Sequence, residues 1–130
     1  MNEILFSGTI PLKPVTKKNS MQIARTKSGR PFLIQSKQYR DYAKQVGQFL
    51  QREEPITEPC NVEMVFYMPT RRRVDLSNLQ SACLDVLVDN GILEDDNCKI
   101  VVTHDGSRVI MGDPEPRTIV TITKRGNDIC

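Results

Sequence analysis

The sequence predicts a small α/β protein whose elements follow the order β-α-β-α-β-β. Four short segments have the alternation or composition of strands, and two longer segments carry apolar residues at three- and four-residue steps, the period of one helical face. The chain has 130 residues, a length that suits one small domain. We therefore expect residues 1–130 to fold as a single domain.

The first strand and the first helix flank a long basic segment. Ile4, Phe6 and Ile10 fall on alternate positions of the strand, which ends at prolines. Residues 17–31 have no clear period and exceed the usual length of a connection, so we expect a loop that meets a ligand. Ser36 is a good N-cap for the helix. The apolar face of this helix is expected to contain Tyr39, Tyr42, Ala43, Val46, Phe49 and Leu50.

The second half of the chain predicts a strand, a helix and two further strands. Alternating apolar residues from Val62 to Met68 predict a buried strand face. The helix that follows has Asp75 or Ser77 as a possible N-cap and is expected to stop at Asn90-Gly91. The last two strands are expected at residues 100–104, with an extension to 110, and at residues 117–124. The buried stripe of the second helix is expected to contain Leu76, Leu79, Cys83, Val86 and Leu87.

Charge is distributed unevenly, although the net charge is only +2. Between residues 13 and 44, nine basic residues stand against the single acid Asp41, and between residues 85 and 105, six acids stand against Lys99. Two solvated faces of opposite charge would explain this pattern. The pattern is also typical of a polyanion held by the basic region while metal ions neutralise the acidic one.

Cysteine spacing and hydropathy exclude several kinds of site and location. The four cysteines lack C-x-x-C spacing and the chain has one histidine, His104, so a zinc site of the usual spacing is not expected. Residues 1–12 lack the basic start and apolar core of a signal peptide, and no apolar run reaches membrane-spanning length. We expect a cytoplasmic protein with no membrane partner and with free cysteines.

The strongest candidate for chemistry is the run Arg71-Arg72-Arg73 followed by Asp75, with a second acidic cluster, Glu94-Asp95-Asp96, about twenty residues later. Carboxylates from separate elements can hold one or two Mg²⁺ ions, which position a water molecule and stabilise charge on the oxygens of a phosphodiester. Asp75 could equally serve only as the N-cap of the helix, and the two roles can coexist. The combination indicates chemistry on a nucleic-acid backbone.

Distances along the helix indicate which carboxylate could share a metal ion with Asp75. A helix rises about 1.5 Å per residue, so Asp85 should lie roughly 15 Å from Asp75. An extended return after Gly91 could bring Asp96 closer, which makes Asp96 the better partner. In an extended segment Asp95 would point to the other side, whereas a turn would bring both carboxylates in. The predicted catalytic and metal-binding residues are Asp75, Asp96 and Asp95.

The basic residues around these acids predict a surface for a nucleic-acid backbone. Planar guanidinium groups suit phosphate oxygens, and further cations would add affinity that falls steeply with salt. Any one of these cations could instead be only solvated. The predicted DNA-binding residues are Lys17, Lys18, Arg25, Lys27, Arg30, Arg71, Arg72 and Arg73.

In these features the sequence resembles the RusA family of Holliday-junction resolvases, small dimeric endonucleases of phage and prophage origin. The resemblance covers most of the chain: the K-P-V-T-K-K-N-S segment from Lys13, the M-P-x-R-R-R approach, D-L-S-N-L from Asp75, and Asp95-Asp96 before a strand. It implies a single RusA-like endonuclease domain over residues 1–130, with a mixed sheet and an intimate homodimer.

The family pattern at the helix start is D-x-D-N-L-x-K, with a further aspartate in the later acidic turn, and these residues are implied to hold Mg²⁺ or support cleavage. Ser77 stands where the second aspartate is expected, and Ser81 stands where the lysine is expected. A hydroxyl is a poorer Mg²⁺ ligand than a carboxylate, and Ser81 cannot supply the cation. The residues that match the pattern are Asp75, Asn78, Leu79 and Asp96.

The resemblance implies Mg²⁺-dependent hydrolysis of paired phosphodiesters across a four-way DNA junction, in DNA recombination and repair. Two possibilities stay open. A looser site could bind metal through the aspartates and water, with the three arginines or Lys99 replacing the missing positive charge. Alternatively, the dimer could bind branched DNA and cut it weakly or not at all. A third interpretation is an RNA-binding or interaction module whose acids are structural.

Overall fold

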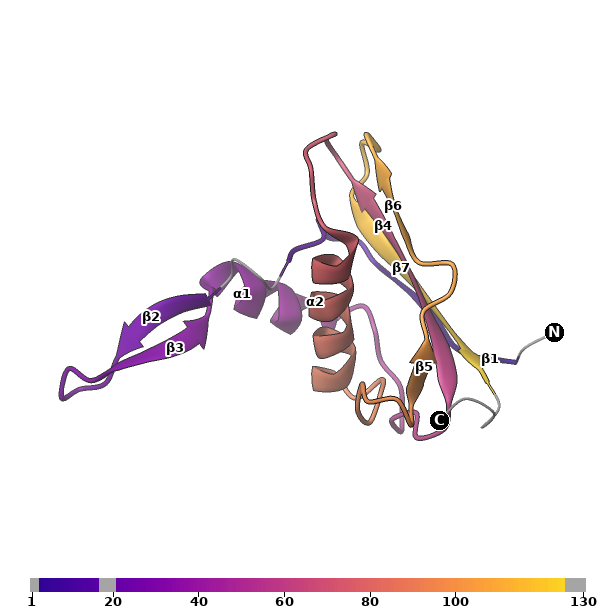
Figure 1. Cartoon of the computed structure of the whole chain (residues 1–130), viewed down its shortest axis with the longest axis horizontal. Coiled ribbons are helices and arrows are strands. Elements are labelled where there is room, and N and C mark those ends of the chain that lie inside the picture. Colours follow the sequence, from indigo (N-terminus) through magenta and orange to yellow (C-terminus); the bar gives the residue numbers. More distant parts are fainter. Residues whose placement is uncertain (1–2, 17–20, 126–130) are drawn as a thin grey trace.

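The computed structural model describes residues 3–16 and 21–125, and this part of the chain has the predicted α/β class (Figure 1). No helix within it is long and apolar enough to cross a membrane. The helices are α1 (Lys37–Val46) and α2 (Leu76–Asp89). The strands are β1 (Ile4–Ile10), β2 (Met21–Arg25), β3 (Pro31–Gln35), β4 (Cys60–Met68), β5 (Val101–Thr103), β6 (Arg108–Met111) and β7 (Arg117–Lys124).

The main sheet is mixed, as the resemblance implied. β7 lies between β1 and β4 and runs antiparallel to both. The other edge of β4 carries β5 and then β6, each parallel to β4. Both helices lie on one side of this sheet, with α2 against it (Figure 1).

The strand that was expected at residues 100–104, with an extension to 110, is two strands, β5 and β6, that follow each other along β4. Side chains satisfy the backbone where the pairing breaks. The Asn61 side-chain carbonyl accepts a hydrogen bond from the Asp105 N–H at 2.7 Å, and the Ser107 hydroxyl accepts one from the Met64 N–H at 3.0 Å. These hydrogen bonds replace the backbone bonds of a continuous strand pairing. The segment between β5 and β6 can therefore separate from β4 before β6 pairs with it again.

The order expected from the sequence also lacks the hairpin formed by β2 and β3, which we call the arm (residues 21–35). Within the segment expected to be a loop, the Gly29 N–H donates to the Thr26 carbonyl at 2.9 Å, and Gly29 has a φ of +87°, a conformation that glycine adopts without strain. The two strands make their main contacts with each other. The arm therefore projects from the body just ahead of α1 (Figure 1).

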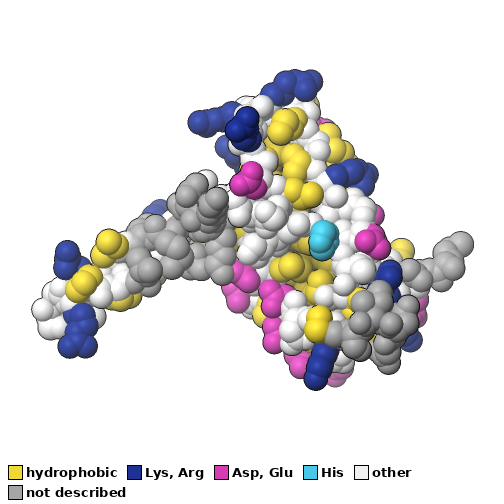
Figure 2. Space-filling model, viewed as in Figure 1, with side chains coloured by type: hydrophobic (Ala, Val, Ile, Leu, Met, Phe, Trp, Pro, Cys, Tyr) yellow, Lys and Arg dark blue, Asp and Glu magenta, His cyan; other side chains and the backbone are white. Residues whose placement is uncertain are grey.

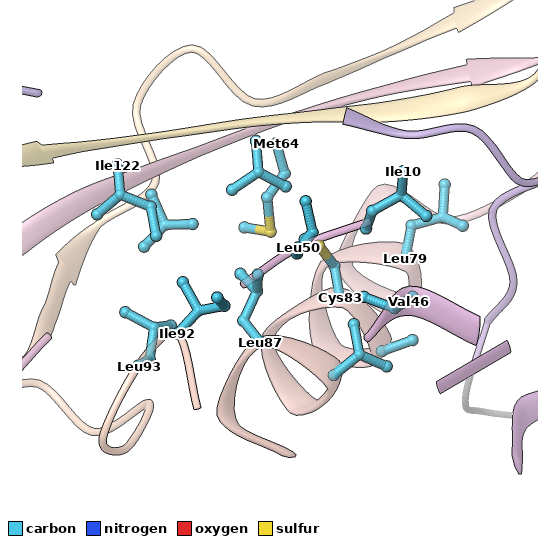
Figure 3. Close-up of a cluster of buried hydrophobic side chains, with 14 of the residues drawn as sticks. Ile10, Val46, Leu50, Met64, Leu79, Cys83, Leu87, Ile92, Leu93 and Ile122 are labelled. Carbon is cyan, nitrogen blue, oxygen red and sulfur yellow. The ribbon is translucent and has the colours of Figure 1, made fainter. Parts of the chain in front are cut away.

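The core is one apolar layer between the helices and the sheet (Figure 3). The alternating residues Val62, Met64, Phe66 and Met68 of β4 face it, and each is at most 9% exposed, as predicted. Burial raises the pKa of the Cys83 thiol to about 12, so this cysteine is a neutral packing group. The buried residues of α2 are Leu79, Ala82, Cys83, Val86 and Leu87.

At α1, the sequence predicted the N-terminal cap correctly and the C-terminal end of the apolar face incorrectly. The Ser36 hydroxyl accepts a hydrogen bond from the Tyr39 N–H at 3.2 Å, which confirms the predicted N-cap. The helix stops at Val46, before the last two residues of the predicted apolar face. Leu50 is nevertheless buried, but Phe49 is 44% exposed, so its predicted place in the core was wrong.

Ile4 was also expected on the buried side of the first strand, and it is 62% exposed. The pairing of β1 with β7 shifts between Ile4 and Phe6, where β1 advances two residues while β7 advances one. This irregularity changes the side to which the start of the strand points.

Candidate active site

Three exposed arginines occupy the loop between β4 and α2. Among the described residues, Arg71, Arg72 and Arg73 form no ion pair with a carboxylate. A Cβ added to Gly112, in the turn between β6 and β7, would lie 3.7 Å from the Arg71 guanidinium, so this turn lies beside the loop. The positive charge of the loop is therefore not neutralised by a neighbouring side chain of the described chain.

Asp75 follows these arginines and occupies the N-cap position of α2, the first of the two positions expected for the cap. Its carboxylate makes no capping hydrogen bond with the helix backbone. Instead, Oδ2 accepts a hydrogen bond from the side-chain amide of Asn78 at 3.2 Å. A residue that serves only as an N-cap would accept a hydrogen bond from the helix backbone, and Asp75 does not. Its exposed carboxylate, oriented by Asn78, is instead free to bind a ligand.

The exposed face of α2 continues through Ser77 and Ser81, which lie one helical turn apart. Between them, Gln80 Nε2 lies 3.0 Å from Nδ1 of His104, a residue just after β5. The site residues predicted from the sequence did not include His104. No local signal could have joined two residues on separate elements, since their contact depends on how β5 pairs with β4.

The acidic cluster forms a turn in which Asp95 binds its neighbours. Its Oδ1 accepts from the Asp96 N–H at 2.7 Å, and its Oδ2 accepts from the Asn97 side-chain amide at 3.2 Å. The Asn97 side-chain carbonyl in turn accepts from the Lys99 N–H at 2.9 Å. The segment is therefore turned rather than extended, the second of the two predicted geometries.

Asp96 lies in a locally negative environment. Its pKa is raised above the usual range, first by partial burial, then by a hydrogen bond with Asp95, and further by the charges of Asp85 and Asp95. Asp85 was set aside as a partner of Asp75, and its closeness to the acidic turn was not predicted. Nearby carboxylates disfavour the charged form of Asp96, and a bound cation would reverse this effect.

Within one chain, Asp75 and the acidic turn belong to opposite ends of α2 (Figure 1). The fourteen residues of this helix span about 21 Å. The Ile92 N–H donates to the Leu87 carbonyl at 2.9 Å, so the chain leaves the helix close to its last turns. In residues 3–16 and 21–125, no three His, Cys, Asp or Glu side chains lie together in a way that could hold a metal ion.

The remaining predicted DNA-binding residues belong to the arm or lie beyond the described chain. Arg25, Lys27 and Arg30 are exposed around the turn of the arm, where Arg25 Nη1 donates to the Gly29 carbonyl at 3.1 Å. Lys17 and Lys18 lie outside the described residues. Basic side chains occur on the arm and gather at the top of the body in this view, with others scattered at its right side and lower end, while many of the acidic ones gather below the base of the arm (Figure 2).

Comparison with known proteins connects this arrangement to one family. The family model described as "Endodeoxyribonuclease RusA" matches residues 11–123. The chain belongs to the RusA family. Two of its relatives are the crossover junction endodeoxyribonucleases RusA of Shigella sonnei (strain Ss046) and Escherichia coli (strain K12). Each is 28% identical over 131 residues, which cover 95% of this chain and 98% of the relative.

The RusA match includes the arm, the arginine loop, α2 and the acidic turn. Of the pattern that the sequence resemblance implies, this chain has Asp75, Asn78, Leu79 and Asp96, with hydroxyls at Ser77 and Ser81. The contact of Gln80 with His104 brings an imidazole to the same stretch of α2 from which the lysine of the RusA pattern is missing.

Proposed function

We propose that this chain is a metal-dependent endonuclease that resolves four-way (Holliday) DNA junctions by paired cuts, in recombination and repair. Membership of the RusA family and the names of its relatives support this function. The observation that carries it is the uncapped, exposed carboxylate of Asp75 directly after three arginines that have no carboxylate partner among the described residues. Residues 1–130 would act as one RusA-like endonuclease domain.

A homodimer would resolve the separation of the acidic groups. Asp75 and Asp96 stand at opposite ends of a helix about 21 Å long, too far apart for carboxylates to share one ion. If the start of α2 in one subunit lay beside the acidic turn of the other, each dimer would contain two equivalent shared sites. A two-fold axis relates such sites in the same way as the two strands that are cut at a junction.

The residues present fit a hard divalent cation such as Mg²⁺. Asp75 and Asp96 supply carboxylate oxygens. The pKa of Asp96 is raised first by partial burial and then by its hydrogen bond with Asp95 and by nearby negative charge, and a cation would offset the effect of that charge. Asp95 accepts two hydrogen bonds and could add a remaining lone pair. When bound, the ion would make a water molecule more acidic and stabilise charge on the phosphate.

The basic residues would bind and orient the DNA strand. Arg71, Arg72 and Arg73 lie next to Asp75 in the sequence, so their guanidinium groups would hold phosphate oxygens beside the carboxylate. The arm and Lys17 with Lys18 would bind further along the backbone. Recognition would depend mainly on the shape of the DNA and its backbone.

A second candidate function is a branched-DNA-binding dimer with weak or no cleavage. Ser77 and Ser81 favour it, because both lie exposed on α2 and provide neither the carboxylate nor the ammonium group of the RusA pattern. Binding would then be retained through the basic residues while hydrolysis was slow.

A cleavage assay on a synthetic four-way junction tests the first function. We expect symmetric nicks with Mg²⁺ and none with EDTA. Asp75→Asn and Asp96→Asn should each lower the rate by more than the roughly 10- to 100-fold typical for loss of a supporting residue at a metal site, without loss of binding. Asp89→Asn, at the exposed last residue of α2, is the matched control and should cut at the wild-type rate.

Two results would contradict this assignment. Cutting that persists in both Asp75→Asn and Asp96→Asn would remove the proposed site. Tight junction binding by the wild-type protein, with no cutting at any Mg²⁺ concentration, would favour the binding dimer.

A further inference from the structure

The arm exposes large hydrophobic side chains that the proposed cleavage site does not use. Phe32 is 45% exposed and Ile23 is 67% exposed. Phe32 pairs across the hairpin with Ala24, whereas Ile23 pairs with Leu33, so Phe32 and Ile23 point to opposite faces of the arm. A two-stranded hairpin is only marginally stable alone in water, and β2 and β3 make their main contacts with each other. The arm therefore has the character of a binding element.

The charge of the arm identifies the chemistry of its partner. Residues 21–35 include Arg25, Lys27 and Arg30 and no aspartate or glutamate. Figure 2 shows basic and hydrophobic side chains interleaved on the part of the arm that is described. Cations that follow a backbone, combined with an aromatic ring on which a base can stack, are typical of surfaces that bind unpaired nucleotides. A second copy of the same basic arm would repel it.

β3 of the arm is joined to α1 through a single residue, Ser36. β3 ends at Gln35, and Ser36 is the N-cap of α1, where its hydroxyl accepts from the N–H of the buried Tyr39. With no linker between them, the direction of the arm follows that of α1 (Figure 1). Because this short connection limits the movement of the hairpin, the arm can hold a side chain in contact with DNA.

We propose that the arm probes the centre of a branched DNA, with Phe32 stacking on a base at the branch point while Arg25, Lys27 and Arg30 hold the flanking phosphates. Base stacking is interrupted where helical arms meet, so insertion of a ring costs less there than within a continuous duplex. The arm thereby favours junctions over duplex DNA. This inference rests on the proposed junction function and adds a specificity-determining residue outside the cleavage site.

Binding and chemical probing of the full-length protein, in EDTA to prevent cutting, test this role. The measurements are the affinities for a four-way junction and for a duplex of the same sequence, and the permanganate reactivity of thymines at the branch point, which reports unstacking. We expect wild-type protein to raise this reactivity. Phe32→Ala should lose the increase and bind the junction about tenfold more weakly, with duplex affinity unchanged.

Two matched variants separate stacking from general effects on the arm. Phe32→Tyr keeps the ring and should behave as wild type. Ile23→Ala removes a more exposed hydrophobic side chain from the opposite face and should also retain junction selectivity. Equal melting temperatures of Phe32→Ala and wild type would show that the body remains folded.

The outcomes distinguish this proposal from the proposed function. Wild-type selectivity and reactivity in Phe32→Ala, with Mg²⁺-dependent cutting intact, would overturn the role of the arm alone. Dissociation of a dimer by Phe32→Ala, with unchanged DNA selectivity, would assign the arm to a second copy of the chain and likewise overturn it. A wild-type protein with no preference for junctions would overturn both proposals.

Discussion

Ser77 and Ser81 lie one turn apart on the exposed side of α2, directly after the site built around Asp75. A hydroxyl binds Mg²⁺ less well than a carboxylate does, and Ser81 has no ammonium group to stabilise negative charge on a phosphate. The Gln80–His104 contact places an imidazole near the position at which this ammonium group is absent. The activity of this member of the RusA family therefore depends on how much these two positions contribute.

We predict that the double substitution Ser77→Asp with Ser81→Lys raises the rate of junction cutting by about tenfold or more, because it restores a ligand and a cation. Single-turnover cleavage at saturating protein measures the effect. Replacing both serines by alanine is the control and should change the rate little. A wild-type rate that neither pair of substitutions alters would show that the site does not need these groups.

At the scale of elements, one side chain adds hydrogen bonds between the two helices to their apolar packing. Asn90, the C-cap residue of α2, donates from Nδ2 to the Ala43 carbonyl of α1 at 3.3 Å and to the Val86 carbonyl at 2.9 Å. The close packing has no room for a larger residue at Gly47, since a Cβ there would lie 2.7 Å from Asn90 Oδ1. This contact helps to position α1, and β3 of the arm leads directly into α1.

Asn90→Ala should lower the free energy of unfolding by about 1–2 kcal/mol, because two carbonyls lose a hydrogen-bond donor. Gly47→Ala should also destabilise the protein, because the added methyl group must displace Asn90. Urea denaturation measures both effects, and Gln48→Ala, at an exposed neighbouring position, should stay within about 0.5 kcal/mol of wild type. Wild-type stability of Gly47→Ala would mean that the helices are not locked by this contact.

At the scale of the whole molecule, the length of α2 bears on how the proposed site would be assembled. Asp75 and the acidic turn stand at its two ends, so the proposed metal site would use both only if it drew on two chains. A site contained in one chain and a site shared by two chains make opposite predictions for mixed dimers.

We predict that mixing Asp75→Asn and Asp96→Asn proteins restores cutting, although each is inactive alone. In a shared arrangement, the mixed dimer has one site with both aspartates and one with neither, so it should nick a single strand of the junction rather than make paired cuts. Strand-labelled junctions measured after subunit exchange report this outcome. If every site lay within one chain, no mixture would cut.

Much of the fold and part of the candidate site follow from local sequence patterns. Ser36 caps α1, alternate residues of β4 are buried, α2 (Leu76–Asp89) lies between the caps Asp75 and Asn90, and the last strand spans Arg117–Lys124, each in agreement with a prediction. Periodicity and capping depend on neighbours within one to four residues, so the sequence alone carries these signals.

Other features of the fold and of the candidate site depend on contacts between residues that are far apart in the sequence. One such feature is the division of one predicted strand into β5 and β6, and another is the exposure of the arm. The closeness of Asp85 to Asp96 and the separation of Asp75 from the acidic turn are two more. The sequence singled out arginines and carboxylates as the candidate residues. Their distances emerged only from the folded chain, because contacts between distant residues depend on strand pairing and on the direction of the exit from α2, which no local period encodes.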